Sequence, residues 1–348
     1  MRTVSIGGRR VGDGEPCFCI AEAGSNHNGS LATAKQLVDV AVEAGADAVK
    51  FQLFRADRLY PRGAGRSEYL KVDRSIYDII AEMEMPYDWI EPLVAHCRAG
   101  GVMFLASVFD EDAADRIDGD VPAFKVASYE MTHIPLVRHL ARKGKPLIIS
   151  TGTAHLDEVR ETVEEVRRAG NEDVILMQCT ASYPAPLDAL NVRAVQTLKR
   201  TFDVPAGLSD HSRDPMVGPV AAIALGANIL EKHYTLDNDL PGPDHRFAVE
   251  PHELKAMIQA IRNTERALGT GEKAPLPVER ELRVFARRSV FALRDIDPDD
   301  VFSSANVAVL RCGNLGAGLP PREYPALLGR RAARRIPAES PIHAEDVR

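Results

Sequence analysis

Short apolar runs alternate with longer segments of helical periodicity along most of the chain. The runs are rich in β-branched residues and predict eight strands: CFCIAEAG, DAVKFQ, VMFLASV, AFKVAS, PLIIST, VILMQCT, AGLSDHS and ANILEKHY. Apolar residues at helical spacing lie between these runs. They predict helices over 30–44, 87–99, 133–143, 155–169, 189–200, 215–225 and 251–268, with a shorter helix over 110–117 after the third strand.

Strands that are apolar throughout, each followed by a helix, are typical of a parallel sheet covered on its outside. Eight such units in about 250 residues predict an α/β fold of the closed (β/α)₈ TIM-barrel type. A doubly wound open sheet is the alternative. It is disfavoured because no Gly-rich dinucleotide fingerprint follows the first strand.

The pattern changes after the segment RALGTGEKAPLPVERE, in which glycines and prolines prevent the preceding helix from continuing. The residues beyond it form short apolar pieces separated by Pro and Gly turns, with Arg-rich stretches such as GRRAARR. We therefore expect a barrel domain over 1–269, a linker over 270–282 and a small separate domain over 283–348.

Composition narrows the class of partner. The chain has 348 residues, of which 45% are hydrophobic, and its net charge is −7, which argues against nucleic acid or an anionic membrane as the main partner. No apolar stretch reaches the ~20 residues of a membrane span, and the first residues lack the apolar core of a signal peptide. The cysteines are odd in number, at five, and lie mostly in apolar segments, so we expect reduced thiols in a cytoplasmic protein. A metal pair at Cys17 and Cys19 is the alternative, although strand alternation explains that spacing.

Polar and ionisable residues gather at the ends of the predicted strands, where parallel barrels carry their active sites. They are Glu22, Lys50, Gln52, Ser107, Lys125, Ser128, Ser150, Thr151, Asp210, His211, Glu231 and His233. One lysine in such a place is commonly a rim residue that reaches solvent. Two lysines inside apolar strands predict a bound anion, because a buried ammonium needs a partner. The interleaved hydroxyls suit a carboxylate or phosphate, so the pocket predicts a phosphorylated or multiply anionic substrate.

Two histidines, His211 and His233, end strands that are neighbours in a barrel, ~4.8 Å apart. A single strand-end histidine is commonly structural, but imidazoles on adjacent strands can share one metal at ~2.0–2.2 Å. Two protein ligands leave positions open for water and substrate, as in a catalytic Lewis acid. The spacing does not choose between zinc, manganese and other divalent ions.

Several segments together resemble the sialic acid (N-acetylneuraminate) synthase family, which includes the pseudaminic and legionaminic acid synthases. They are IAEAGSNHNGS, ADAVKFQLF, AFKVASYEMTHIPLV, ISTGTA, CTASYPAP, GLSDHS and GPDHRFAVEP. The tail LRCGNLGAGLPPREYPALLGRRAARRIPAESPI resembles that family's antifreeze-like SAF domain. The likeness runs in order from about residue 16 to the C-terminus.

The resemblance implies a (β/α)₈ barrel that condenses phosphoenolpyruvate with the open-chain aldehyde of an amino sugar. The acceptor would be N-acetylmannosamine or a related 2,4-diamino-6-deoxy hexose, and the products a nine-carbon 2-keto acid and phosphate. It also implies a divalent metal, typically Mn²⁺, with Mg²⁺, Co²⁺ or Zn²⁺ as alternatives. Family members form a domain-swapped homodimer in which each small domain covers the partner's site.

The resemblance also assigns roles to individual residues. The positions matching phosphoenolpyruvate-binding residues are Lys50, Ser107, Lys125, Ser128 and Ser150. Those matching acceptor-binding residues are Gln52, Glu130, Tyr183, Asp244, Phe285 and Arg311, the last two in the small domain. His211 and His233 match the metal ligands, and Glu22 matches the acid of the first strand; these three are the expected catalytic residues. Asp210 and Glu231 are expected to orient the imidazoles.

Some positions depart from the family's pattern. Ala181 stands where sialic acid synthases proper have Asn, Asn28 replaces a common Glu, and Cys312 replaces the usual Pro. The stretch 55–85 does not align. These departures leave the chemistry intact but leave the acceptor sugar open, and a related synthase using another aldehyde is one alternative. A non-catalytic sugar-phosphate binder would be expected to have lost the histidines or lysines. The small domain could instead be an ice- or glycan-binding module, although its place behind a catalytic barrel favours a lid.

Overall fold

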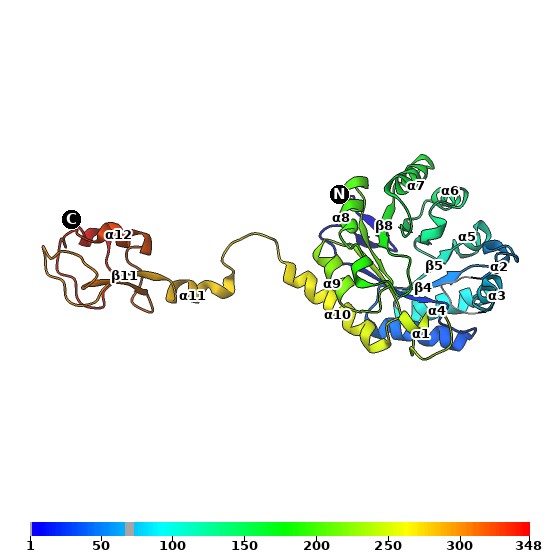
Figure 1. Ribbon diagram of the computed structural model, residues 1–348, viewed down its shortest axis with the longest axis horizontal. Coiled ribbons are helices and arrows are strands. Elements are labelled where there is room, and N and C mark those ends of the chain that lie inside the picture. Colours follow the sequence, from blue (N-terminus) through cyan, green and yellow to red (C-terminus); the bar gives the residue numbers. More distant parts are fainter. Residues whose placement is uncertain (1, 67–72) are drawn as a thin grey trace. The chain divides into compact units, whose positions relative to one another are not determined.

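The computed structural model describes residues 2–66 and 73–348 of the chain. The described residues form two compact units, Met1–Gly269 and Thr270–Arg348, which are considered separately below (Figure 1). The loop over 67–72, part of the stretch 55–85 that does not align, lies outside the described residues.

The first unit is a closed barrel of eight parallel strands, in the order β10-β3-β4-β5-β6-β7-β8-β9. This confirms the predicted TIM barrel, and the open-sheet alternative is wrong. The barrel strands are β3 (Phe18–Gly24), β4 (Ala48–Leu53), β5 (Met103–Val108), β6 (Phe124–Val126), β7 (Leu147–Ser150), β8 (Val174–Cys179), β9 (Ala206–Asp210) and β10 (Ile229–His233). Closure occurs between β10 and β3, where His233 lies beside Glu22.

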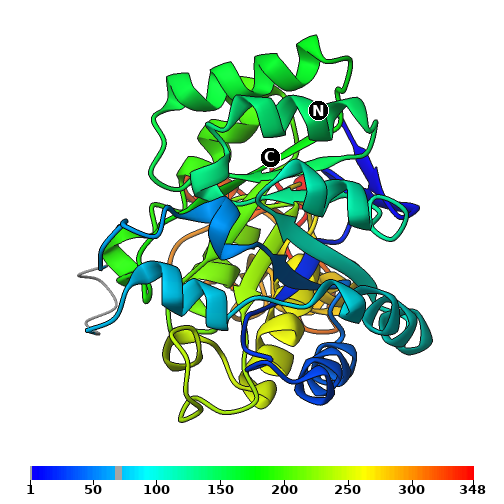
Figure 2. The ribbon, with the colours of Figure 1, turned by 90° about the vertical axis from the view of Figure 1, so that its right-hand side faces the viewer.

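Helices follow the strands and lie around the outside of the barrel (Figure 2). The main ones are α1 (Leu31–Ala44), α4 (Ile90–Gly100), α5 (Glu111–Ile117), α6 (Ile134–Arg142), α7 (Leu156–Arg168), α8 (Ala194–Phe202), α9 (Val217–Ala224) and α10 (Pro251–Leu268). Two short helices, α2 (Ala56–Leu59) and α3 (Ile76–Glu82), lie in the stretch that did not align. Short 3₁₀ turns occupy loops at η2 (Tyr87–Trp89), η3 (Ser128–Glu130), η4 (Leu187–Ala189) and η5 (His245–Phe247).

Helix α1 shows how local sequence sets an element's limits. Ser30 caps its start by accepting a hydrogen bond from the Thr33 amide at 3.2 Å. Gly45 ends it in the left-handed conformation at φ 82°, which a residue without Cβ adopts at little cost. Its buried side, including Leu37 and Val38, packs into the layer between helices and barrel.

The barrel interior has an apolar floor. Because side chains alternate along each strand, every second residue points inward. Near the strand starts these residues are apolar and form one buried cluster that includes Phe18, Leu105, Ile148, Ile175 and Ile229. Further along the strands the inward positions become polar, so the charged groups lie above this floor.

A hairpin closes the floor from below. Strands β1 (Val4–Ile6) and β2 (Arg9–Val11) pair in antiparallel fashion, and Val4, Ile6 and Val11 join the apolar floor cluster. The connection is Gly7 and Gly8, at φ 56° and 86°, a conformation that favours glycine in two-residue hairpin turns. This hairpin was not among the predicted strands, although its Gly-Gly pair between short apolar runs is a recognised hairpin signal.

The second unit is small and has its own core. It contains η6 (Pro277–Glu279), α11 (Arg280–Phe285), β11 (Arg288–Ala292), β12 (Val307–Arg311), η7 (Pro321–Glu323), α12 (Tyr324–Leu327) and η8 (Ala344–Asp346). The two strands pair in antiparallel fashion, and Val290, Phe302 and Ile342 are among its buried residues. Helix α11 begins inside the stretch expected to be a linker.

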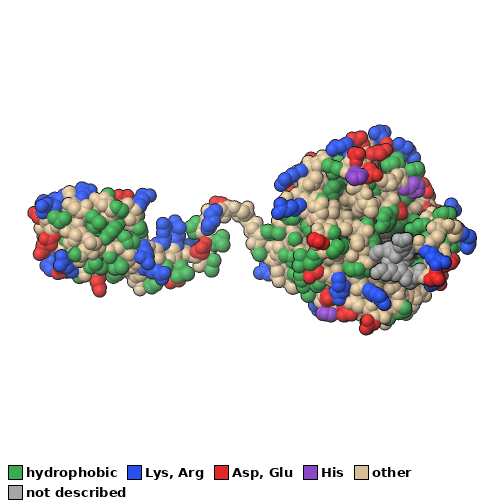
Figure 3. Space-filling view, viewed as in Figure 1, with side chains coloured by type: hydrophobic (Ala, Val, Ile, Leu, Met, Phe, Trp, Pro, Cys, Tyr) green, Lys and Arg blue, Asp and Glu red, His purple; other side chains and the backbone are tan. Residues whose placement is uncertain are grey.

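Acidic and basic side chains are interspersed over the face of the first unit seen in Figure 3. Within the described residues, no helix has both the length and the apolar character needed to cross a bilayer.

Candidate functional site

Lys50 lies at the centre of a buried network at the upper end of the barrel. Its Nζ is 2.8 Å from Glu22 Oε2 and 3.6 Å from Glu231 Oε2, and it donates a 2.8 Å hydrogen bond to Ser107 Oγ. Gln52 donates to the other oxygen of Glu22 at 3.0 Å. Burial alone would lower the pKa of Lys50, but the two carboxylates raise it above its ordinary value. Lys50 is therefore a charged group held in place by two acids.

Lys125 lies on the same inner surface but has different surroundings. Its Nζ donates to Ser150 Oγ at 2.7 Å and to the Val126 carbonyl at 3.1 Å. Among the residues that the structure describes, no carboxylate lies within ion-pair distance of this ammonium. Lys125 is only 2% exposed, and burial lowers its pKa below the ordinary value. A buried ammonium with only neutral direct partners indicates that an anion belongs beside it.

Ser128 and Cys179 continue this surface. Ser128 Oγ accepts a 3.0 Å hydrogen bond from the Gly152 amide. A Cβ at Gly152 would lie 2.8 Å from Ser128 Oγ and 3.2 Å from Cys179 Sγ, so glycine keeps these two polar groups close together. Lys125, Ser128, Ser150 and Cys179 thus line one side of the barrel's upper end, and Lys50 lies beyond them.

The two histidines approach each other as the strand order requires. Their ring centroids are 5.2 Å apart. His211 Nδ1 lies 3.0 Å from the Thr180 carbonyl, which can only accept, so Nδ1 carries a proton, and Nε2 has the free lone pair when the ring is neutral. His233 Nδ1 is buried with no hydrogen-bond partner among the described residues, and Asp244 Oδ2 lies 3.9 Å away. Burial, with the nearby His211, lowers the pKa of His233 well below its ordinary value.

This donor set fits a divalent cation. His233 is neutral and has an unpartnered buried nitrogen, and His211 presents a lone pair. Over residues 2–66 and 73–348, no three His, Cys, Asp or Glu side chains are placed to hold one ion together. The protein would therefore supply two imidazoles, and water or substrate would fill the remaining positions.

Aromatic and acidic groups flank the histidines. Tyr183 lies with its ring centroid 4.3 Å from that of His211, and Phe247 lies 5.0 Å from His233. Burial, reinforced by the charge of Glu22, raises the pKa of Asp244 to about 6. These groups form a partly apolar wall next to the imidazoles.

Gly24 allows several acceptor-side residues to converge. A Cβ at this position would lie 3.3 Å from Asp244 Oδ2 and 3.6 Å from both Gln52 Nε2 and Glu22 Oε1. These three side chains therefore meet around the end of β3. Glu130 lies in η3, where its Oε2 is buried without a hydrogen-bond partner among the described residues. Burial raises its pKa to about 7.

The prediction that Asp210 and Glu231 orient the imidazoles by direct contact is wrong, because within the described residues neither acid bonds to either ring. Asp210 ends β9 on the outward side of the barrel, where its Oδ2 pairs with Lys232 at 2.7 Å. Glu231 points inward, but it accepts from Ser209 Oγ at 3.0 Å and faces Lys50. Adjacent residues on a strand point to opposite faces, so an acid next to a histidine in sequence cannot share its side of the sheet.

The remaining predicted residues, Phe285 and Arg311, lie in the second unit, at the ends of α11 and β12. Both are exposed there. Their structure is described only within that unit.

Three residues of the site were absent from our sequence prediction: Cys179, Thr180 and Ser209. Cys179 Sγ lies 3.7 Å from His211 Nδ1. Counting alternate positions back from the strand ends would have placed Cys179 and Ser209 on the inner face. No sequence signal identifies the Thr180 carbonyl, because it acts through the backbone.

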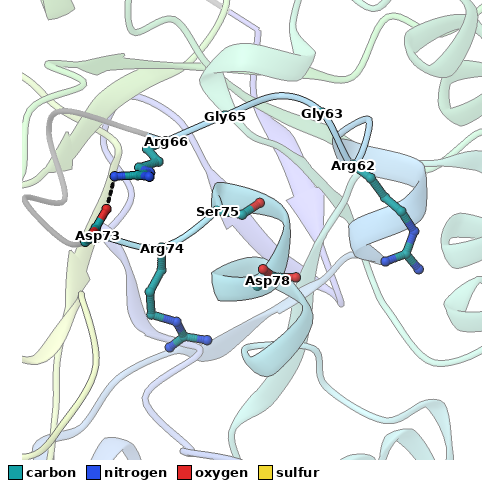
Figure 4. Close-up of a pocket in the computed structure, with 8 residues that line it drawn as sticks. All are labelled: Arg62, Gly63, Gly65, Arg66, Asp73, Arg74, Ser75 and Asp78. Carbon is teal, nitrogen blue, oxygen red and sulfur yellow. Dashed lines mark ion pairs between the residues drawn. The ribbon is translucent and has the colours of Figure 1, made fainter.

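A separate cavity of about 460 Å³ lies in the loop after β4 (Figure 4). Its described lining residues are Arg62, Gly63, Gly65, Arg66, Asp73, Arg74, Ser75 and Asp78, none of which belongs to the network above. Its arginines already have partners: Arg66 pairs with Asp73, Arg74 with Glu82, and Arg62 lies over the ring of Tyr77. The cavity is therefore a weaker candidate for anion binding than the barrel.

The chain is similar to known proteins over most of its length. A model of the NeuB family matches residues 37–273, and a model of the SAF domain matches residues 287–348. The chain is 43% identical over 364 residues to the spore coat polysaccharide biosynthesis protein SpsE of Bacillus subtilis, covering 100% of this chain and 98% of that protein. It is 37% identical over 345 residues to the N,N'-diacetyllegionaminic acid synthase of Legionella pneumophila, covering 97% and 96%.

Solved structures are also similar. A crystal structure of the N-acetylneuraminic acid (sialic acid) synthetase of Leptospira borgpetersenii, in complex with citrate, superimposes with a TM-score of 0.73 at 31% identity. The match covers 81% of this chain and 95% of that one.

Proposed function

The chain belongs to the NeuB family, and from this premise we propose that it condenses phosphoenolpyruvate with an amino-sugar aldehyde. The products would be a nonulosonic 2-keto acid and phosphate. Named relatives include synthases of legionaminic, pseudaminic and N-acetylneuraminate-type acids, so the chain is a synthase of this carbon–carbon bond-forming type. The observation that carries the proposed substrate is the buried ammonium of Lys125, whose direct partners among the described residues are neutral.

Phosphoenolpyruvate supplies what this pocket lacks. Its carboxylate and phosphate can accept from Lys125 and Lys50, with Ser107, Ser128 and Ser150 as hydroxyl donors. Charge-assisted hydrogen bonds of this kind are worth about 1.5–3 kcal/mol each. The negative charge of Glu22 and Glu231 holds Lys50 in position, so Lys125 would gain more from the arriving anion than Lys50 does.

The proposed reaction forms one carbon–carbon bond and breaks one carbon–oxygen bond. The enol carbon of phosphoenolpyruvate forms a bond to the aldehyde carbon, and the aldehyde oxygen gains a proton. Water then adds to the carbon that bears the phosphate and loses one proton. The hydroxyl formed there loses its remaining proton to the departing phosphate as the bond from that carbon to the phosphate oxygen breaks, leaving a ketone and free phosphate. We propose that Glu22 orients the attacking water, because Lys50 and Gln52 fix both of its oxygens above the apolar floor.

His211 and His233 would hold a divalent cation, with Mn²⁺ as the first candidate and Mg²⁺, Co²⁺ or Zn²⁺ as alternatives. When bound there, the cation would supply a Lewis acid that polarises the aldehyde oxygen. The protein's part is to keep His211 in the tautomer set by the Thr180 carbonyl and to keep His233 neutral.

We propose that the acceptor sugar lies against Gln52, Glu130, Tyr183 and Asp244. Tyr183 and Asp244 lie next to the histidines, and Gln52 donates to Glu22. Phe285 and Arg311 would reach the sugar from the partner's small domain. Ala181 provides no side-chain amide at its position, so a 2,4-diamino-6-deoxy hexose derivative fits our proposal better than N-acetylmannosamine. A site whose side chains hydrogen-bond one group of the substrate strongly rejects substrates that lack that group. A site that has lost such a side chain discriminates less between substrates.

A second acceptor class deserves a test because of one comparison. The 43% identical relative is named for spore coat polysaccharide biosynthesis, so a different aldehyde sugar used in polysaccharide assembly is the alternative. The chemistry would be shared, and only the acceptor would differ.

The test is phosphate release from phosphoenolpyruvate with Mn²⁺ and a panel of aldehyde sugars. We expect release to depend on an amino-sugar aldehyde and kcat/KM to be highest for a diamino sugar, while Ala181→Asn shifts preference towards N-acetylmannosamine. If N-acetylmannosamine is the best acceptor and Ala181→Asn is no better with it, the specificity argument is wrong. If no aldehyde releases phosphate, the function itself is wrong.

A further inference from the structure

A buried ion pair lies outside the barrel, directly behind the two histidines. Lys232 Nζ is 2.7 Å from Asp210 Oδ2, and the two side chains are 1% and 0% exposed. Each residue immediately precedes one of the histidines, Asp210 before His211 and Lys232 before His233. Since adjacent strand residues face opposite sides, the ion pair faces the helices while the imidazoles face the interior. Substrate inside the barrel therefore cannot contact this pair.

Lys232 also holds the turn that follows β9. Its ammonium donates to the carbonyls of Ser212 and Asp214, the latter at 2.9 Å. Asp210 Oδ1 accepts from the Ser212 amide at 2.8 Å, so both carboxylate oxygens are engaged. One lysine on β10 thus contacts the side chain that precedes His211 and the backbone that follows it.

The contacts of Lys232, called the clamp below, depend on the register between β9 and β10. Lys232 lies beside Asp210 in the parallel pairing of β10 with β9. A one-residue slip between these strands would break the ion pair and displace His233 relative to His211. A metal shared by two imidazoles requires nitrogen–metal distances of ~2.0–2.2 Å, so small displacements of either ring matter.

Stability alone does not account for such a pair. Replacing a buried ion pair by apolar residues of similar volume is often neutral or stabilising, because both charges lose their hydration. Both side chains of this pair are almost fully buried, and each immediately precedes one of the two proposed ligands. This placement points to a role at those ligands.

We propose that the Asp210–Lys232 pair is a positioning pair that sets the separation of His211 and His233 for metal binding. This inference rests on the proposed metal site. The pair touches neither metal nor substrate, and acts through the strand ends.

The test measures Mn²⁺ affinity directly, by electron paramagnetic resonance of free Mn²⁺ in titrations of the full chain. Three variants disturb the pair differently. Lys232→Met removes the clamp, and Asp210→Asn keeps the shape but removes the charge. Gly218→Ala leaves both charged residues in place but puts a Cβ 2.7 Å from Asp210 Oδ2. We expect each to weaken Mn²⁺ binding by about tenfold to 100-fold, the range found when groups supporting metal ligands are removed.

Two control substitutions make the same chemical changes at positions away from the histidines. Lys199 is another buried lysine, paired with Asp13 and donating to the Gly226 carbonyl before the start of β10. Gly119 has open space where a Cβ would be added. Lys199→Met and Gly119→Ala should therefore leave Mn²⁺ affinity unchanged.

The possible results distinguish the positioning role of the ion pair from the metal site itself. If the unmodified protein binds no Mn²⁺, the proposed metal site fails. If it binds and the folded variants bind equally well, the positioning role is overturned while the metal site stands. Circular dichroism and thermal unfolding report folding, and a chain that fails to fold in all three variants would also overturn the proposal, since the pair would then be a general element of the fold. Weaker Mn²⁺ binding in folded Asp210→Asn or Gly218→Ala, with both controls normal, supports it.

Discussion

Replacing Lys125 by methionine should weaken phosphoenolpyruvate binding and at the same time stabilise the protein. Methionine has a similar length and no charge, so the packing beside Ser150 would change little. In the absence of substrate the ammonium has no carboxylate in direct contact among the described residues, and burial disfavours its charge. Function and stability should therefore change in opposite directions, as at other sites where a binding group is costly in the free protein.

The binding loss follows from the contact that disappears. A charge-assisted hydrogen bond to a buried anion is worth about 1.5–3 kcal/mol, which corresponds to roughly a tenfold to 150-fold higher apparent KM for phosphoenolpyruvate. The acceptor KM should change less, because the hydrogen bonds of Lys125 go to Ser150 and the Val126 carbonyl and not to the proposed acceptor residues.

The pH dependence of the stability gain has a definite sign. The folded-state pKa of Lys125 is lowered, whereas the unfolded chain titrates near its ordinary value of about 10.4. Between these two values the unfolded state binds more protons, so the unmodified protein gains stability as pH rises. The advantage of Lys125→Met should be greatest below the lowered pKa and should shrink as pH approaches about 10.4.

Two measurements check this reasoning. Phosphate release at saturating acceptor gives KM for phosphoenolpyruvate, and chemical denaturation at several pH values gives the free energy of unfolding. Lys50→Met is the comparison, because it leaves Glu22 and Glu231 buried without their cation and should destabilise the chain. An unchanged KM, or a Lys125→Met protein that is less stable than the original at neutral pH, would refute the argument.

Further predictions concern other parts of the site. Chelation should abolish turnover, and Mn²⁺ should restore it. His211→Ala and His233→Ala should each disable the enzyme, and the double variant should be hardly worse, because both ligands act through one ion. Full turnover in the presence of chelator would exclude this metal role. Glu130 has a folded-state pKa of about 7 against about 4.3 unfolded, so the folded state binds more protons between these values and loses stability as pH rises through them. Denaturation midpoints should therefore show an advantage of Glu130→Gln that grows from pH 4.3 to about pH 7 and then stays constant; an advantage independent of pH would contradict the assignment. If the small domain covers the partner's barrel in a homodimer, mixing Arg311→Ala with His211→Ala protein should regenerate activity, and none after verified subunit exchange would favour a lid on its own barrel.

The barrel could be predicted from sequence because its signal is repeated. Each apolar run and the helix after it form one unit, and eight repetitions of the unit determine the fold even where one connector, over 110–117, is short. The inward-facing lysines and histidines could also be located, since a period of two fixes the face of a strand residue once one neighbour is known. Lys50, Lys125, His211 and His233 lie on that face together.

Other features depend on contacts that sequence order does not reveal. The same period of two, applied to DH and EKH, would have placed Asp210 and Lys232 outside the barrel, but their pairing requires the register between β9 and β10. The tautomer of His211 depends on the Thr180 carbonyl, which lies 31 positions earlier in the chain and carries no side-chain signal.

The hairpin beneath the barrel has a consequence for the order of folding. Its residues precede every barrel strand in the chain, yet the apolar cluster that receives them includes Ile229 of the last barrel strand. Val4, Ile6 and Val11 must wait for almost the whole first unit to be synthesised before they can be buried, and contacts so distant in sequence form slowly. Closing the floor is therefore a late event, and substitutions such as Ile6→Ala should mainly accelerate unfolding while leaving the refolding rate nearly unchanged. We therefore expect burial of the hairpin to slow the unfolding of a barrel that has already closed.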